Sequence, residues 1–185
     1  MSAPRLEGFI HRAAVPADED GIAALMELAI SALLPQFLTP QQVALSRSIM
    51  GLDRQLIADG TYFVVLDEAT GQLAASGGWS NRATLYGGDH STAQRNAALL
   101  KMGVDAARIR AMYTHPEFTR RGLGRYVLEI CEGAARAAGF HRVELMATLG
   151  GEPLYRACGY EEIERMISAS AGGVDVPGLR MGKAI

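Results

Sequence analysis

The segment best suited to chemistry is 119–125, Thr-Arg-Arg-Gly-Leu-Gly-Arg, which combines two glycines with three arginines. It precedes a long amphipathic stretch, so the pattern predicts the start of a helix. The first turn of a helix has unpaired backbone N–H groups, and glycine lets an anion approach them closely. Because the whole chain carries a formal net charge of −2, this local positive charge favours an anion site. The pattern therefore favours a diphosphate as the ligand.

Other motifs for phosphate or nucleophilic chemistry do not fit. The dinucleotide-binding fingerprint needs a third Gly or Ala where Val127 stands, and a Walker loop needs Lys-Ser/Thr after its glycines. Residues 74–78, Ala-Ala-Ser-Gly-Gly, lack the first glycine of a serine-hydrolase elbow. Cys131 and Cys158 form neither a disulfide framework nor a zinc cluster. We therefore expect no metal.

Composition restricts the class of protein further. A length of 185 residues with 49% hydrophobic and 21% charged residues is typical of one globular domain, here 1–185. The slightly negative charge argues against binding to nucleic acid or an anionic membrane surface. The first residues lack a signal peptide, and no apolar run approaches the ~18–20 residues of a membrane span. We expect a cytoplasmic protein.

The segments before residue 105 have clear signals for regular elements. The predicted elements are a strand over 8–14, a helix from 18–20 to Leu33, a helical region from Thr39 to Gly60, and a hairpin of strands 62–66 and 73–79. Thr39, Pro40 and Gln42 provide a cap, a first-turn proline and a capping-box partner. Residues 81–104 have no clear period and are expected to form a long loop.

The segments after residue 105 predict a strand, a helix, a strand, a short helix and a closing strand pair. Their ranges are 107–113, 123–138, 143–147, 152–157, and 160–168 with 174–182. Within 107–113, small or apolar residues at odd positions alternate with Arg, Arg and Met at even positions, as in a strand with two different faces. The order of elements predicts a mixed sheet with helices on its faces.

This order of elements, with His115-Pro116, Arg120–Gly124 and the run 154–160, Leu-Tyr-Arg-Ala-Cys-Gly-Tyr, resembles the GNAT acetyltransferase superfamily. The motifs cover about 105–165, and the element order fits nearly the whole chain. The resemblance implies an α/β (α+β mixed) fold. Its sheet would be mixed and mostly antiparallel, with helices on both faces and a splayed central parallel strand pair. It also implies acetyl-CoA as co-substrate.

The resemblance implies roles for particular residues. The pantetheine arm would lie along the backbone of Met112, Tyr113 and Thr114. The diphosphate would be held by Arg120, Arg121, Gly122, Leu123, Gly124 and Arg125. Three positions depart from the family pattern: Thr119 stands where the first Arg or Gln is usual, Thr148 where an asparagine is frequent, and Gly151 where an alanine is usual.

Tyr155 is the catalytic candidate, because the resemblance places it near the CoA sulfur as the proton donor to the departing thiolate. A phenol is protonated at neutral pH and can serve in this way. The alternative is a structural tyrosine packed under the final strands. For the general base, His115, Glu117, His90 and Asp89 remain open, and a water chain would serve as well.

The acceptor pocket is expected near Trp79, Arg82 and Tyr86, where aromatic and polar residues follow the hairpin. A packed loop would account for the same residues.

The leading hypothesis is a CoA-dependent N-acetyltransferase that moves an acetyl group to a primary amine of a small molecule or peptide by direct attack. The alternative is a non-catalytic acyl-CoA-binding sensor or partner module. Pro177 and the apolar closing strands suggest a sheet edge that another copy covers. We therefore expect a homodimer.

Overall fold

The computed structural model describes residues 4–91, 95–169 and 174–185. The strands are β1 (Phe9–Ala13), β2 (Tyr62–Asp67), β3 (Leu73–Ser80), β4 (Ala107–Thr114), β5 (Arg142–Ala147), β6 (Glu161–Ala169) and β7 (Asp175–Ala184). The α-helices are α1 (Glu19–Leu33), α2 (Pro40–Ile49), α3 (Arg54–Ala58), α4 (Leu123–Ala137) and α5 (Glu152–Ala157), and the 3₁₀ turns are η1 (Pro16–Asp18), η2 (Leu34–Gln36) and η4 (Pro116–Phe118). Of the helices in the described ranges, none has the length and apolar character needed to cross a membrane.

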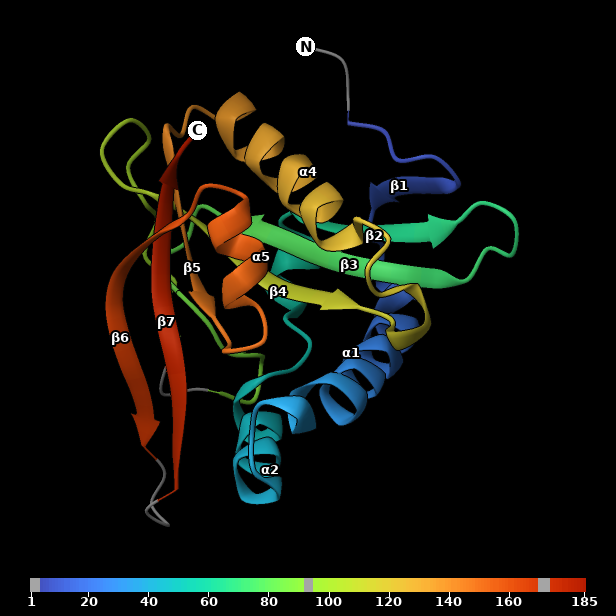
Figure 1. Cartoon of the computed structure of the whole chain (residues 1–185). Helices are drawn as coiled ribbons and strands as arrows, with labels where there is room; N and C mark the ends of the chain where they lie inside the picture. The colour runs from blue at the N-terminus through green and yellow to red at the C-terminus, as the bar shows by residue number, and fades with distance from the viewer. Residues whose placement is uncertain (1–3, 92–94, 170–173) are drawn as a thin grey trace.

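In the described residues the strands form one seven-stranded sheet with the order β1-β2-β3-β4-β5-β7-β6. All neighbouring strands are antiparallel except β4 and β5, which are parallel. One hydrophobic cluster joins α4 and α5 to one face, and a second joins α1, α2 and α3 to the other. Figure 1 shows the sheet between these two helical layers, with α4 above it and α1 and α2 below. The predicted mixed α/β fold is confirmed.

Local signals account for most element boundaries. The Thr39 side chain accepts a hydrogen bond from the Gln42 N–H, and the Gln42 side chain accepts one from the Thr39 N–H, so the predicted capping box begins α2. At the C-terminal end of α4, Gly139 has a φ of +92°, a conformation that favours glycine. Between residues 81 and 104 the described part forms an irregular segment whose one isolated bridge joins Arg82 to Leu99.

The alternation within β4 is interrupted by a bulge. Ser76 pairs with Tyr113 and Gly78 with Arg110, so β4 has one more residue than β3 between these pairs. Ala111 takes a φ of +52° at this position. As a result Ile109 packs with the α4 cluster, whereas Tyr113 packs with the α1 cluster. The expectation that the odd positions of 107–113 share one face is therefore wrong beyond Ile109.

The expectation that Pro177 marks an edge strand is also wrong. β7 lies between β5 and β6, and Pro177 pairs with Ile167 of β6. The pairing of β7 with β5 ends at Leu179 opposite Ala147. Pro177 is tolerated because it lies beyond that point, where β5 offers no carbonyl for a proline N–H to bond.

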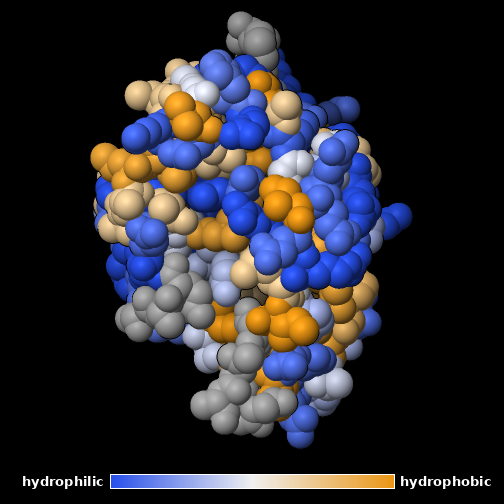
Figure 2. Space-filling view, turned by 90° about the vertical axis from the view of Figure 1, so that its left-hand side faces the viewer, coloured by the Kyte–Doolittle hydropathy of each residue, from blue (hydrophilic) through white to orange (hydrophobic). Residues whose placement is uncertain are grey.

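β6 is the edge strand on this side, and we keep the prediction that a second copy covers it. Ile163 and Ile167 are 49% and 65% exposed on β6. Figure 2 looks onto this side, where hydrophobic side chains form several separate groups among hydrophilic ones. Light scattering at tens of micromolar is expected to give twice the mass of the chain, and Ile167→Lys is expected to shift it toward the monomer. A monomeric mass for the parent would contradict the prediction.

Candidate functional site

The two parallel strands diverge soon after they pair. β4 and β5 pair at Ala107 with Val143 and at Arg108 with Glu144, and both continue beyond these pairs without further partners between them. Glu144 forms ion pairs with Arg108 and with Arg180 of β7, so charged side chains hold the closed end together. On the side that faces β5, backbone groups of β4 beyond the last pair are therefore open to bond an extended ligand. This is the splayed pair that the resemblance implied.

A groove of about 980 Å³ passes through this gap. On the α4 side its lining includes Gly124, Leu154 and Tyr155, and on the α1 side it includes Ile30 and Leu34. A ligand in the groove can thus extend from one helical layer to the other between the two strands. The volume lies in the range of known ligand pockets.

The loop before α4 has the backbone conformation of an anion site. Gly122 is the N-cap of α4 with a φ of +83°, and Arg120 has a φ of +64°. Left-handed residues in a turn can direct neighbouring backbone N–H groups toward one point. The groove is lined here by Arg120, Gly122, Leu123, Gly124 and Arg125. The structure therefore brings together five of the six residues expected at the diphosphate.

Packing also requires a glycine at position 124, in addition to the close approach of a ligand. A Cβ at this position would lie 2.6 Å from Cδ2 of Leu154, so glycine lets α5 pack against the start of α4. Arg125 strengthens the same contact, because its guanidinium donates a hydrogen bond of 3.2 Å to the Ala157 carbonyl. The Arg120 guanidinium, in contrast, has no polar partner in the part of the chain that the structure describes.

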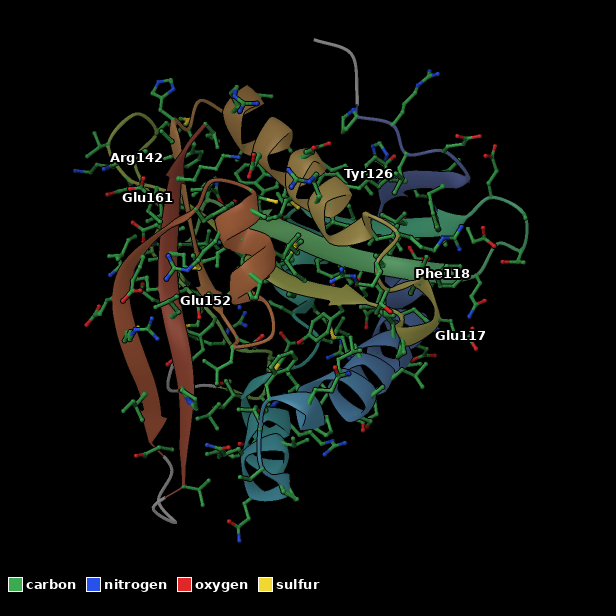
Figure 3. All side chains as sticks on the ribbon, in the orientation of Figure 1. Glu117, Phe118, Tyr126, Arg142, Glu152 and Glu161 are labelled. Atoms are coloured by element: carbon green, nitrogen blue, oxygen red, sulfur yellow. The ribbon has the colours of Figure 1, made fainter. Side chains whose placement is uncertain are left out.

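Arg121 lies outside the residues that line the groove. Its guanidinium stacks over the rings of Phe9 and Phe118, 4.7 Å and 5.3 Å from their centroids. Figure 3 shows Phe118 on the short segment between β4 and α4, beside Glu117. The contact anchors this segment to β1, so the Arg121 side chain has a structural role.

Tyr155 differs from the four tyrosines whose hydroxyl hydrogen bonds are known. The hydroxyls of Tyr62, Tyr126 and Tyr160 bond Ser76, His11 and Glu132, and that of Tyr113 bonds the Gly51 backbone. Tyr155 is buried and lines the groove, yet within the described ranges its hydroxyl has no hydrogen-bond partner. Burial raises the pKa of Tyr155 above its ordinary value of 10, so the phenol stays protonated. Its proton is available to a ligand.

The other residues expected along the cofactor also line the groove. Met112, Tyr113 and Thr114 belong to the end of β4 that pairs with β3 but not with β5. The bulge at Ala111 sets their orientation, and the Tyr62 hydroxyl holds it by donating a hydrogen bond of 2.9 Å to the Ala111 carbonyl. Tyr113 and Tyr155 both line the groove, so two phenols lie near each other in the gap. Burial and the neighbouring Tyr155 raise the pKa of Tyr113.

The three residues expected at the acceptor pocket lie in different places. Tyr86 lines the groove. Trp79 is buried in the α4 cluster with its ring 6.0 Å from that of Phe140, and Arg82 forms an ion pair with Asp59 at 2.7 Å. Neither Trp79 nor Arg82 is among the residues that line the groove.

The residues considered as general base are also elsewhere. His115, Glu117, His90 and Asp89 are not among the residues that line the groove. The His115 ring accepts a hydrogen bond from the Glu117 N–H and so caps η4, and Asp89 pairs with Arg54 at 3.0 Å. Of the described residues that line the groove, none is Asp, Glu, His or Lys. No described group of three His, Cys, Asp or Glu side chains could hold a metal ion.

Two features of the groove were missed by the sequence reasoning. The first is its wall from α1, η2 and α2, because the apolar residues there give only the pattern of a core-facing helix. The second is Arg110, which lines the groove while its guanidinium pairs with Asp53 at 2.5 Å, the two side chains being 4% and 1% exposed. A charged residue in an apolar strand was the available signal for Arg110, but nothing local pointed to Asp53.

Comparisons with known proteins agree with this geometry. The model of the Acetyltransferase (GNAT) family matches residues 23–160. A comparison with curated proteins finds no relative of this chain.

Solved structures share the fold. A GCN5-related N-acetyltransferase from Rhodopseudomonas palustris matches with a TM-score of 0.69 at 17% identity, covering 100% of both chains. A GNAT-family acetyltransferase from Listeria monocytogenes matches with a TM-score of 0.62 at 20% identity, covering 100% of this chain and 99% of that one. A chain of the NatC complex bound to Gag peptide and CoA matches with a TM-score of 0.59 at 11% identity, covering 96% and 98%. At these identities the likeness concerns the fold.

Proposed function

Since this chain belongs to the acetyltransferase (GNAT) family, we propose that it moves the acetyl group of acetyl-CoA directly to a primary amine, with Tyr155 as the proton donor to the thiolate. The observation that carries the proposal is the unpartnered Tyr155 hydroxyl in a groove that begins at the start of α4. The ring of Tyr155 is buried, but its hydroxyl is not among the buried, unpartnered polar atoms of the described residues. The hydroxyl can therefore be reached from the groove, where it can donate a hydrogen bond to a ligand.

The diphosphate of CoA would bind at the start of α4. The backbone N–H groups of Leu123, Gly124 and Arg125 belong to the first turn, where the helix dipole favours an anion. The Arg120 and Arg125 guanidiniums would add charge from the groove lining. The pantetheine arm would then lie between β4 and β5, where extended ligand amides can pair with the backbone groups of 112–114 that face β5.

The reaction would proceed by direct attack. The amine nitrogen forms a bond with the thioester carbonyl carbon, and a backbone N–H of the splayed β4 stabilises the developing oxyanion. The C–S bond then breaks, the electron pair stays on sulfur, and the Tyr155 hydroxyl donates its proton to that sulfur. Water returns a proton to the Tyr155 oxygen before the next turnover. The proton lost by the amine goes to water, because no acidic or histidine side chain is among the described lining residues.

We expect Arg120→Gly to weaken CoA binding and to stabilise the fold at the same time. Loss of a charge-assisted contact would raise the Kd for CoA about tenfold. Removal of the side chain also relieves the positive φ of 64°, worth about 1 kcal/mol, so Tm would rise by about 2–4 °C. Calorimetry with CoA and thermal denaturation measure the two effects.

Arg121→Ala is the matched control. It removes the stacking on Phe9 and Phe118, which we expect to lower stability by about 0.5–1 kcal/mol while the Kd for CoA stays nearly constant. If Arg121→Ala raises the Kd for CoA more than Arg120→Gly does, Arg121 makes the phosphate contact and the role proposed for Arg120 is wrong.

A further inference from the structure

The half of the groove on the α1 side has an apolar wall. Its apolar lining residues include Ile30 of α1, Leu34, Phe37, Ile49 of α2, Leu85 and Val176 of β7. Gln36, Ser46 and Tyr86 add polar groups without charge. These residues come from four separate segments. The wall is therefore a property of the assembled fold.

This half of the groove offers no free charge within the described residues. The charged residues of the whole lining are Arg110, Arg120 and Arg125. Arg120 and Arg125 belong to the α4 end, and the Arg110 charge is compensated by the buried Asp53 carboxylate. The Arg110 guanidinium also donates to the Gly87 carbonyl. A charged group on an acceptor would find no opposite charge here.

We infer that the acceptor is a primary amine attached to an apolar, uncharged group, which occupies the α1 side of the groove. The inference rests on the proposed function and names its substrate class. Burying an apolar substituent against this wall is favourable, whereas burying a second charge without a partner is strongly unfavourable. The amine itself enters as the free base, so it needs no carboxylate.

We assign to Phe37 a role in selecting which acceptor amines bind. It is 49% exposed, and its Cε2 would lie 2.7 Å from a Cβ placed on Gly150. The ring thus reaches from the connection between α1 and α2 to the loop between β5 and α5. It covers the groove where an acceptor substituent would pass.

The test uses the purified full chain with acetyl-CoA and three series of acceptors: n-alkylamines, the α,ω-diamines of equal length and the ω-amino acids of equal length. We expect kcat/KM to rise up to about fourfold for each added methylene in the alkylamines, the fold-change that corresponds to about 0.8 kcal/mol. The diamines and amino acids are expected to react at least tenfold more slowly than alkylamines of equal length, with the KM for acetyl-CoA unchanged.

Phe37→Asp tests the position of the wall. We expect it to lower kcat/KM for hexylamine about tenfold and to raise it for the diamine, whose far ammonium gains a partner. Leu28→Asp is the matched control, because Leu28 is 47% exposed on α1 but does not line the groove. Leu28→Asp should leave the order of acceptors unchanged.

Each outcome decides between the proposals. Faster reaction with the diamines or the amino acids than with alkylamines would overturn the inference and leave the proposed acetyl transfer intact. An equal response to Phe37→Asp and Leu28→Asp would overturn the assigned wall. CoA binding without acetylation of any amine would overturn the proposed function, and the acceptor class with it.

Discussion

Replacing Tyr155 with phenylalanine is expected to lower kcat by about 10²–10⁴-fold with little change in Tm or in the Kd for CoA. The ring and its edge contact with Tyr160, at 5.8 Å between centroids, stay in place. The hydroxyl has no partner among the described residues, so its removal breaks no hydrogen bond of the fold. Single-turnover acetylation measures the chemical step even where product release limits kcat.

Tyr160→Phe is the control for this prediction. The Tyr160 hydroxyl donates a hydrogen bond of 3.0 Å to Glu132, so its loss should lower the free energy of unfolding by about 1 kcal/mol and leave turnover nearly intact. Near-normal single-turnover acetylation by Tyr155→Phe would show that the thiolate leaves without this proton. A loss of stability without a loss of rate would make Tyr155 a structural tyrosine.

The pH dependence follows from the same residue. Burial raises the pKa of Tyr155, so the protonated form is retained in the folded enzyme and is lost only when the pH exceeds this raised value. Deprotonation of Tyr155 should therefore cause no decrease in kcat up to pH 9. A decrease that is present in the parent and absent in Tyr155→Phe would contradict this.

Asp53→Asn is expected to lower the free energy of unfolding by about 3–5 kcal/mol. The substitution keeps the shape of the side chain but leaves the Arg110 guanidinium buried without its counter-charge. Asp53 also accepts a hydrogen bond from the Gln55 N–H and contacts Arg95 at 3.2 Å, so it joins α3, β4 and the segment after β3. Chemical denaturation measures the loss.

Two further variants test whether the loss of stability comes from the buried ion pair or from any substitution in this region. Asp59→Asn breaks the more exposed ion pair with Arg82 near the end of α3 and should change stability by about 1 kcal/mol or less. The double variant Asp53→Leu with Arg110→Met should recover most of the loss, because apolar residues can replace a buried pair. Equal effects of Asp53→Asn and Asp59→Asn would refute the assignment.

The sequence by itself determined the elements whose signals are local. The capping box at Thr39 and Gln42, the amphipathic α4 and its glycine-rich start, and the hairpin of β2 and β3 are confirmed. Each depends on residues a few positions apart, because capping, helical periodicity and strand alternation are short-range effects. The resemblance to the GNAT family could be recognised for the same reason, since its motifs are contiguous.

Only the tertiary structure decided which residues share the groove. The bulge at Ala111 turns Tyr113 to the α1 side, and strand alternation alone would have placed it with Ile109. Trp79 meets Phe140 in the core, and Asp53 meets Arg110, although each partner is far away in sequence. The groove exists because β4 and β5 separate while helices pack on both faces of the sheet. Its walls are therefore set by long-range packing and pairing, which no local pattern encodes.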